Sequence, residues 1–121
     1  MIGTNDIAWW MAEPVITVAD RVGIILDKIK ANVPYSTVLL CSIPPVSSKI
    51  IENVKVDRQI LCKNYNLALK GLAYQYKEQK VRFVDVCETL TLADLRDGIH
   101  PNAEGNRKIG ELLAAEIKGL L

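Results

Sequence analysis

The sequence lacks several features that would place it in a class of protein at first sight. None of its 121 residues belongs to a run approaching the ~18 consecutive apolar residues that a membrane-spanning helix requires. Its 15 lysines and arginines are offset by 14 aspartates and glutamates, so it has no charge excess to attract nucleic acid or an anionic membrane. The start of the chain shows neither the basic nor the apolar region of a secretory signal. We therefore predict no membrane span and no nucleic-acid partner.

Cysteine is scarce as well. Cys41, Cys62 and Cys87 are odd in number, far apart in the sequence and without any C-x-x-C pair, so they match neither a disulfide framework nor a zinc site. We expect free, buried thiols, because cysteine packs as a small hydrophobic residue. No motif in the sequence implies a metal ion or an organic cofactor.

What the sequence does contain is apolar residues in regular patterns. Half of the residues are hydrophobic, enough at this length for the core of one domain. Apolar residues recur at helical spacing over positions 15–29, over about 48–76, and from near 102 almost to the last residue. Asn102 is a good N-cap for the last of these predicted helices. Nearly continuous apolar runs at 36–43 and 81–86 are typical of strands buried on both faces of a parallel sheet. The order helix–strand–helix–strand–loop–helix predicts an α/β layered fold.

Two strands are too few for such a sheet, which usually has about four to six. Met1 and Ile2 look like the end of a further apolar strand that leads into a polar loop. We therefore expect residues 1–121 to be the C-terminal portion of a single larger domain. The alternative is an intact small domain that completes its sheet by pairing with another copy through an exposed sheet edge.

Three polar segments follow the predicted strand ends, where open parallel sheets bind their ligands. They are residues 3–6, 42–48 and 97–102. In the last segment, Asp97 and His100 are spaced so that the carboxylate can hold the imidazole of the same turn, fix its tautomer and stabilise its charged form. That arrangement suits a general base that acts on a hydroxyl group.

Asn5 lies in the first of these segments, and an asparagine amide after a strand can donate the hydrogen bond that an oxyanion needs. Each residue also has an ordinary interpretation. Asp97 and Gly98 are a common turn sequence, Asn102 caps a helix, and Gly-Thr-Asn-Asp is itself a turn sequence. The two motifs occur together, one after a strand and the other before the final helix. This combination favours a catalytic role over an ordinary role in turns.

The two motifs resemble those of a known family. MIGTNDI resembles the third block, Gly-x-Asn-Asp, of the SGNH or GDSL family of serine esterases and lipases, and DGIHPN at 97–102, followed by Gly105, resembles the fifth block. The segment VLLCSIPP at 38–45 is similar to the strand and loop between those blocks. The resemblance covers the whole chain. The residues of MIGTNDI and of the Ile-Pro-Pro loop favour the acetylxylan-esterase-like carbohydrate esterases within the family.

The resemblance implies a fold and a set of roles. The fold is a three-layer αβα sandwich with a parallel sheet, SGNH or flavodoxin-like, here without its N-terminal strands. His100 corresponds to the general base, Asp97 to the acid that orients it, Asn5 to the oxyanion donor and Gly3 to the block glycine that lets the loop pass close to the site. The implied substrate is a small-molecule or carbohydrate ester. Secretion is implied if the chain follows the carbohydrate esterases.

The family's first two blocks, with the nucleophilic serine of Gly-Asp-Ser, do not occur in these 121 residues. The serines are Ser36, Ser42, Ser47 and Ser48, and none matches a nucleophile motif. Ser42 and Ser47 follow a strand but lack an activating elbow, and the cysteines lack the environment of a Cys–His pair. We therefore predict a hydrolase fragment that is inactive, or nearly so, by itself.

Two interpretations from other classes stay open beside the hydrolase. One is a catalytically inactive truncated chain that acts as a binding or assembly module, with the sheet edge as its pairing surface. The other is an unrelated flavodoxin-like nucleotide binder, which the lack of a Gly-rich phosphate loop disfavours.

Overall fold

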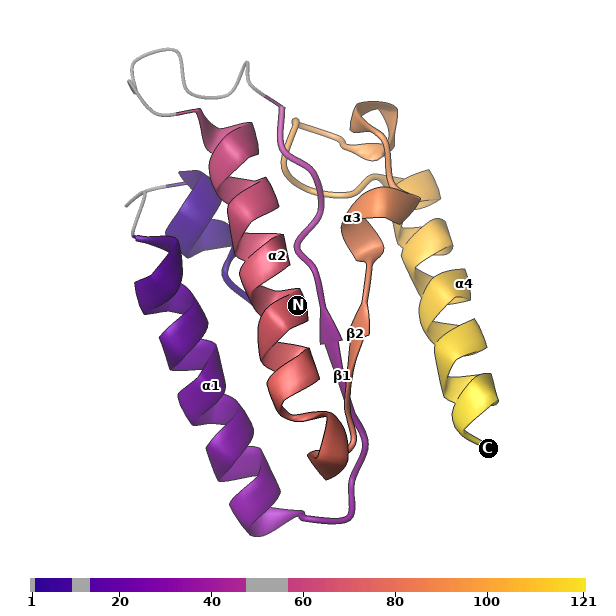
Figure 1. Ribbon diagram of the computed structural model, residues 1–121. Helices are drawn as coiled ribbons and strands as arrows, with labels where there is room; N and C mark the ends of the chain where they lie inside the picture. Colours follow the sequence, from indigo (N-terminus) through magenta and orange to yellow (C-terminus); the bar gives the residue numbers. More distant parts are fainter. Residues whose placement is uncertain (1, 10–13, 48–56) are drawn as a thin grey trace.

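The computed structural model describes residues 2–9, 14–47 and 57–121. Two long helices, α1 and α2, lie on one side of a small sheet of strands β1 and β2, and α4 lies on the other side (Figure 1). The main elements are α1 (Val15–Asn32), β1 (Val38–Cys41), α2 (Arg58–Gln75), β2 (Val81–Val84) and α4 (Ala103–Leu120). The short ones are η1 (Asn5–Trp9), η3 (Lys77–Gln79), α3 (Val86–Thr89) and η4 (Leu92–Asp94).

The sheet is parallel, as predicted, and its residues alternate between two helical layers. Val38 pairs with Val81 and Cys41 with Val84. Val38 and Leu40 pack with α1 and α2, whereas Leu39 and Cys41 pack with α3 and α4. This alternation, which follows from the pleat of a strand, gives the three-layer αβα arrangement that the family resemblance implied. Within the described ranges the sheet consists of these two strands. A further strand was predicted to end at Met1 and Ile2; Met1 lies outside these ranges, and Ile2 is described but is not in a strand.

The helices begin and end near the predicted positions. α1 ends at Asn32, as expected before the Val33-Pro34 step. α2 begins after Asp57, whose side chain accepts hydrogen bonds from the backbone N–H groups of the first turn. Residues 48–56, which were also predicted to be helical, lie outside the described residues. α4 begins after Asn102, which caps it as predicted by accepting the N–H of Gly105 at 2.9 Å.

Both strands are shorter than predicted, and the chemistry of their ends explains why. The second was expected to continue to residue 86, but β2 ends at Val84 because the Asp85 side chain accepts the N–H of Glu88 and starts α3. The first was expected over 36–43, and β1 covers only its centre. Apolar character alone does not separate a strand end from a short buried helix such as α3.

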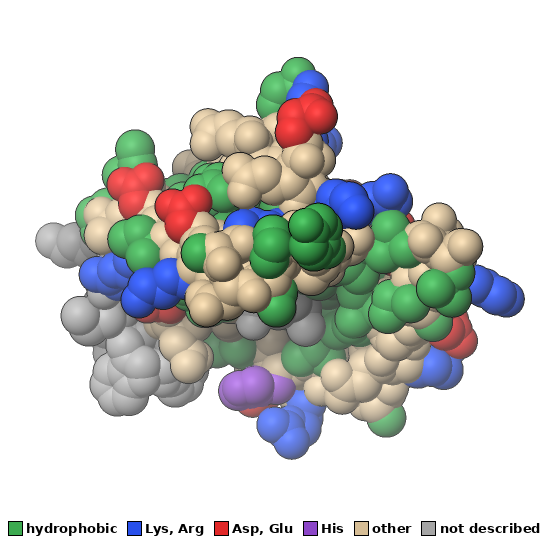
Figure 2. Space-filling model, turned by 90° about the horizontal axis from the view of Figure 1, so that it is seen from below, with side chains coloured by type: hydrophobic (Ala, Val, Ile, Leu, Met, Phe, Trp, Pro, Cys, Tyr) green, Lys and Arg blue, Asp and Glu red, His purple; other side chains and the backbone are tan. Residues whose placement is uncertain are grey.

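The apolar stripe predicted for the last helix is only partly buried. Of that stripe, Ile109 is buried, while Ile117 is 51% exposed. Figure 2 shows hydrophobic side chains on the surface at the side where α4 lies. The described part of the sheet is too narrow to cover the whole length of the helix. No helix in the described part of the chain combines the length and apolar character needed to cross a membrane.

The carboxyl ends of both strands point to the edge where η1 and residues 95–101 lie (Figure 1). Ile7, Val46 and Ile99, one from each of the three predicted polar segments or directly beside it, are buried in one core cluster. The backbone N–H of Ser47 also donates to the carbonyl of Gly98 at 2.8 Å. The structure therefore brings the three segments together at one end of the sheet.

Candidate active site

Asp97 and His100 form a closed acid–base pair at this end of the sheet. The Asp97 Oδ2 atom lies 2.5 Å from His100 Nδ1, and Oδ1 accepts the backbone N–H groups of His100 at 2.7 Å and Ile99 at 3.0 Å. The backbone N–H of His100, then its side chain, and then the N–H of Ile99 hold the pKa of Asp97 well below its ordinary range. The carboxylate therefore stays ionised and can stabilise a charged imidazole.

The pairing determines which ring nitrogen of His100 is available. An ionised carboxylate only accepts hydrogen bonds, so in the neutral imidazole Nδ1 carries the proton and Nε2 keeps its lone pair. The His100 side chain is 60% exposed, and the ring, purple in Figure 2, lies at the surface of the molecule. Nε2 is thus positioned to take a proton from a hydroxyl group that approaches from outside.

The loop that carries the pair is closed on itself. Gly98 adopts φ +83°, a conformation that side chains other than glycine rarely accept. The backbone N–H of Arg96 donates to the carbonyl of His100 at 2.8 Å, and Leu95 and Pro101 form an antiparallel bridge. These bonds fix the backbone on both sides of the tip, so the pair does not depend on an open, mobile loop.

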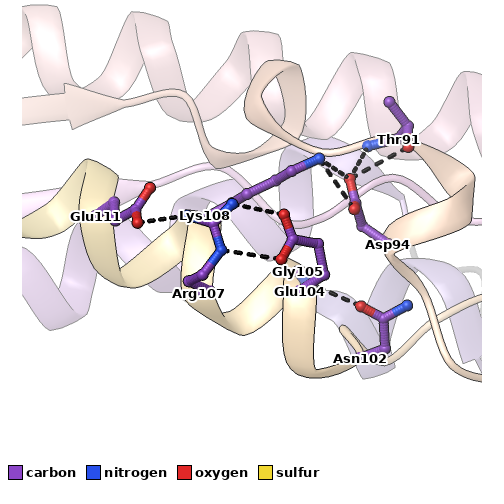
Figure 3. Close-up of polar contacts among 8 residues, drawn as sticks. All are labelled: Thr91, Asp94, Asn102, Glu104, Gly105, Arg107, Lys108 and Glu111. Carbon is purple, nitrogen blue, oxygen red and sulfur yellow. Dashed lines mark hydrogen bonds and ion pairs between the residues drawn. The ribbon is translucent and has the colours of Figure 1, made fainter.

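The base of the loop is attached to α4 by a network of polar contacts (Figure 3). The Asp94 carboxylate, 6% exposed, accepts the Lys108 ammonium at 2.9 and 3.0 Å and the N–H of Thr91 at 2.8 Å. The carbonyl of Asp94 accepts the N–H of Asn102 at 2.8 Å. Because Asn102 also caps α4, hydrogen bonds join the helix to both ends of the loop.

Gly105 makes this attachment close. A Cβ atom at this position would come within 2.5 Å of the Asp94 carbonyl oxygen and 3.1 Å of the Pro101 Cβ. Any side chain here would push the loop away from α4. This contact gives a physical reason for the glycine that follows the DGIHPN motif.

Asn5 begins η1, on the same end of the sheet, and is exposed. Gly3 before it adopts φ +109°, and a Cβ there would lie 2.4 Å from the Tyr65 hydroxyl oxygen. The backbone N–H of Ile7 closes the turn onto the Gly3 carbonyl at 3.0 Å. The absence of a side chain at Gly3 thus lets this turn pack closely against Tyr65 of α2.

Ser42, the serine at the end of β1, has a structural role. It is fully buried, its Oγ donates to Asp85 Oδ1 at 3.0 Å, and it accepts the N–H of Cys87 at 2.8 Å. The hydroxyl joins the end of β1 to the start of α3 and has no access to a substrate. Burial also raises the pKa of the Cys62 thiol to about 12 and raises that of Cys87, so neither is a ready thiolate nucleophile.

Sequence reasoning missed two contributors to this end of the molecule. Arg58, in the first turn of α2, is only 6% exposed, and its Nη1 donates to the carbonyl of Ile7 at 2.9 Å. Asp94 and Lys108 form the buried attachment described above. Charged residues at the start of a helix or in a polar loop are usually solvated, so the sequence contains no signal that distinguishes these three.

The fold and the Asp97–His100 pair together define a three-layer α/β domain with an acid–base pair in the loop before its last helix. The GDSL-like lipase/acylhydrolase family matches residues 1–108. The chain belongs to this family.

Among the known proteins that the chain is similar to are a curated esterase and two solved structures. A multidomain esterase from Ruminococcus flavefaciens is 31% identical over 123 aligned positions, covering 99% of this chain and 15% of that protein. A protein from Streptococcus pneumonia, provisionally described as a platelet activating factor, is 27% identical with a TM-score of 0.81. A GDSL-like lipase from Bacteroides thetaiotaomicron is 21% identical with a TM-score of 0.73 and shares the fold. The chain covers 56% and 60% of these two solved structures.

Proposed function

We propose that this chain supplies the acid–base and oxyanion side of a carboxylic-ester hydrolase of the Ser-His-Asp type. The observation that carries the proposal is the 2.5 Å contact between Asp97 and His100 Nδ1, which leaves Nε2 on the surface as a base. Membership of the GDSL-like family supports hydrolysis of an ester. In this proposal residues 1–121 are the C-terminal portion of one SGNH-type domain, and the serine comes from a segment outside them.

The reaction assigns one task to each group. His100 Nε2 takes the proton of the serine hydroxyl while the serine oxygen attacks the ester carbonyl. Asn5 donates a hydrogen bond to the oxyanion that forms, and Asp97 stabilises the charged imidazole. His100 then gives its proton to the leaving alcohol. Water, activated by the same nitrogen, releases the acid and restores the serine.

The substrate class that we propose is an acylated small molecule or carbohydrate, with acetyl esters as the first to test. The similarity to a multidomain esterase supports an ester substrate. The resemblance of MIGTNDI and the Ile-Pro-Pro loop to the acetylxylan-esterase-like carbohydrate esterases supports an acetylated carbohydrate. The exposed position of the Asp97–His100 pair is compatible with a bulky alcohol group such as a sugar.

The test compares the 121-residue chain alone with the same chain joined at its amino end to a segment that carries a Gly-Asp-Ser block. With p-nitrophenyl acetate, the chain alone should give no burst of product, because no activated serine is present. The joined protein should give a burst and turn over, and His100→Ala should lower kcat by about 10²–10⁴-fold.

Two results would contradict the proposal. A burst from the chain alone that Ser47→Ala abolishes would show that it carries its own nucleophile. A folded joined protein without activity would favour the non-catalytic binding or assembly module. Slow hydrolysis without a burst is the background expected of an exposed imidazole and counts for neither.

A further inference from the structure

Helix α2 holds the Asn5 turn at two points. The Tyr65 hydroxyl donates to the carbonyl of Ile2 at 2.8 Å, and Arg58 Nη1 donates to the carbonyl of Ile7 at 2.9 Å. The two side chains are about two helical turns apart on the same face of α2. Asn5 lies between the two anchored carbonyls, so α2 sets the position of its turn from both ends.

Arg58 is a costly way to make such a contact. Its side chain is 6% exposed, and its Nε atom is buried with no hydrogen-bond partner among the described residues. Within residues 2–9, 14–47 and 57–121 no carboxylate forms an ion pair with it; Asp57 caps α2, and Asp6 faces Arg21 at 4.0 Å. A buried charge without an ion partner is strongly unfavourable, and an apolar chain of similar length would pack as well. Packing alone therefore does not account for an arginine here.

We propose that Arg58 is a positioning residue that acts through Asn5. By fixing the Ile7 carbonyl, it holds the Asn5 turn in the geometry that an oxyanion donor requires. The role of Asn5 as that donor rests on the proposed function. The buried cation lies one hydrogen bond from this turn. In a water-poor surrounding it also favours negative charge that develops nearby.

The first test measures the turn itself in the 121-residue chain, without catalysis. The Ile7 amide, bonded to the Gly3 carbonyl, reports opening of the turn, and the Leu26 amide in α1 reports opening of the whole fold. In Arg58→Met, hydrogen exchange at Ile7 should become about 10- to 100-fold faster, the factor expected for a hydrogen bond from a charged donor. Exchange at Leu26 should not change, since methionine replaces the buried charge with an apolar chain.

Matched variants separate the anchoring of the Asn5 turn from general effects on stability. Tyr65→Phe removes the other anchor and should also speed exchange at Ile7. Tyr76 lies just after the same helix, but its hydroxyl donates to Asp27 at 2.5 Å and not to the Asn5 turn. Tyr76→Phe should therefore leave hydrogen exchange at Ile7 unchanged. Unchanged exchange at Ile7 in Arg58→Met, or equal acceleration at Leu26, would overturn the proposal.

The second test asks whether Arg58 acts through Asn5 in the serine-containing joined protein. Arg58→Met should lower kcat about tenfold or more and leave KM within about twofold, because an oxyanion contact is made only in the transition state. In an Asn5→Ala background the same change should cost less than about twofold. Arg58→Lys should restore part of the loss.

Additive effects of Arg58→Met and Asn5→Ala would overturn the positioning role. The two tests fail independently. If the joined protein is inactive, the proposed function fails, while the exchange measurement still decides whether Arg58 holds the turn.

Discussion

The backbone N–H of Ser47 donates to the carbonyl of Gly98 at 2.8 Å, and thereby links the loop after β1 to the tip of the loop that carries Asp97 and His100. The tip is thus held by a neighbouring strand end, while its base is held by α4 through Asp94 and Lys108. The candidate base is fixed from two directions, although its ring is exposed.

Gly105→Ala should destabilise the chain by about 1–3 kcal/mol, because a Cβ there would lie 2.5 Å from the Asp94 carbonyl oxygen and overpack the contact. Gly110→Ala is the matched control in the same helix, since a Cβ at that position would meet no neighbouring element of the described chain within 4 Å. It should stabilise by about 0.5–1 kcal/mol, the helix preference for alanine over glycine. Urea denaturation of the two variants measures both, and equal effects would contradict the packing argument.

Lys108→Met should destabilise more than Arg107→Met, although both remove one positive charge from α4 (Figure 3). Lys108 pairs with the buried Asp94 carboxylate, which would then lack its cation, whereas Arg107 pairs with Glu104 and Glu111 on the exposed surface. Exposed pairs contribute little, and removing one partner of a buried pair costs much more. Denaturation midpoints at low and high salt give the comparison. An equal loss in the two variants would show that the Asp94 contact does not anchor the loop.

Ser42→Ala should cost about 1–3 kcal/mol of stability, because the buried N–H of Cys87 loses its acceptor. It should leave ester hydrolysis by the joined protein unchanged, since the hydroxyl faces Asp85 and not the surface. Ser36→Ala, which removes an exposed hydroxyl bonded to the nearby Val33 carbonyl, is the control and should change stability little. Loss of activity without loss of stability in Ser42→Ala would reverse the structural assignment of this residue.

The pairing of Asp97 predicts a pH dependence of folding. Its pKa is lowered in the folded state relative to about 3.9 in the unfolded chain. The pairing therefore stabilises the fold fully above about pH 5, and this contribution is lost as the pH falls below about 4 toward the folded pKa. The stability difference between the wild-type chain and Asp97→Asn should shrink over that range. Denaturation from about pH 7 to about pH 2 measures it, and a difference that grows on acidification would contradict the assignment.

Features that depend on neighbours in the sequence were predictable. The end of α1 before Pro34, the Asn102 cap and the contact between Asp97 and His100 all follow from residues within one turn of each other. The parallel pairing of two apolar strands also followed from the order of elements, whereas the three layers were implied by the family resemblance.

Features that depend on distant residues were not predictable. The burial of Arg58, the Asp94–Lys108 pair and the approach of Gly3 to Tyr65 depend on how helices dock. Strand ends were missed for a different reason, since Asp85 competes for the backbone by capping α3. The roles of Asn5, Asp97 and His100 in catalysis remain predictions that the proposed experiments test.

The two sides of the candidate site differ in how far along the chain their contacts reach. The Asp97–His100 contact joins residues three apart, whereas the anchors of the Asn5 turn join residues 51 and 63 apart. Local contacts close at little cost in chain entropy, and distant ones depend on the docked fold. Partial unfolding should therefore release the Asn5 turn first and leave the Asp97–His100 contact formed. Mild denaturant should therefore open the Asn5 turn while the Asp97–His100 contact persists, before the fold as a whole is lost.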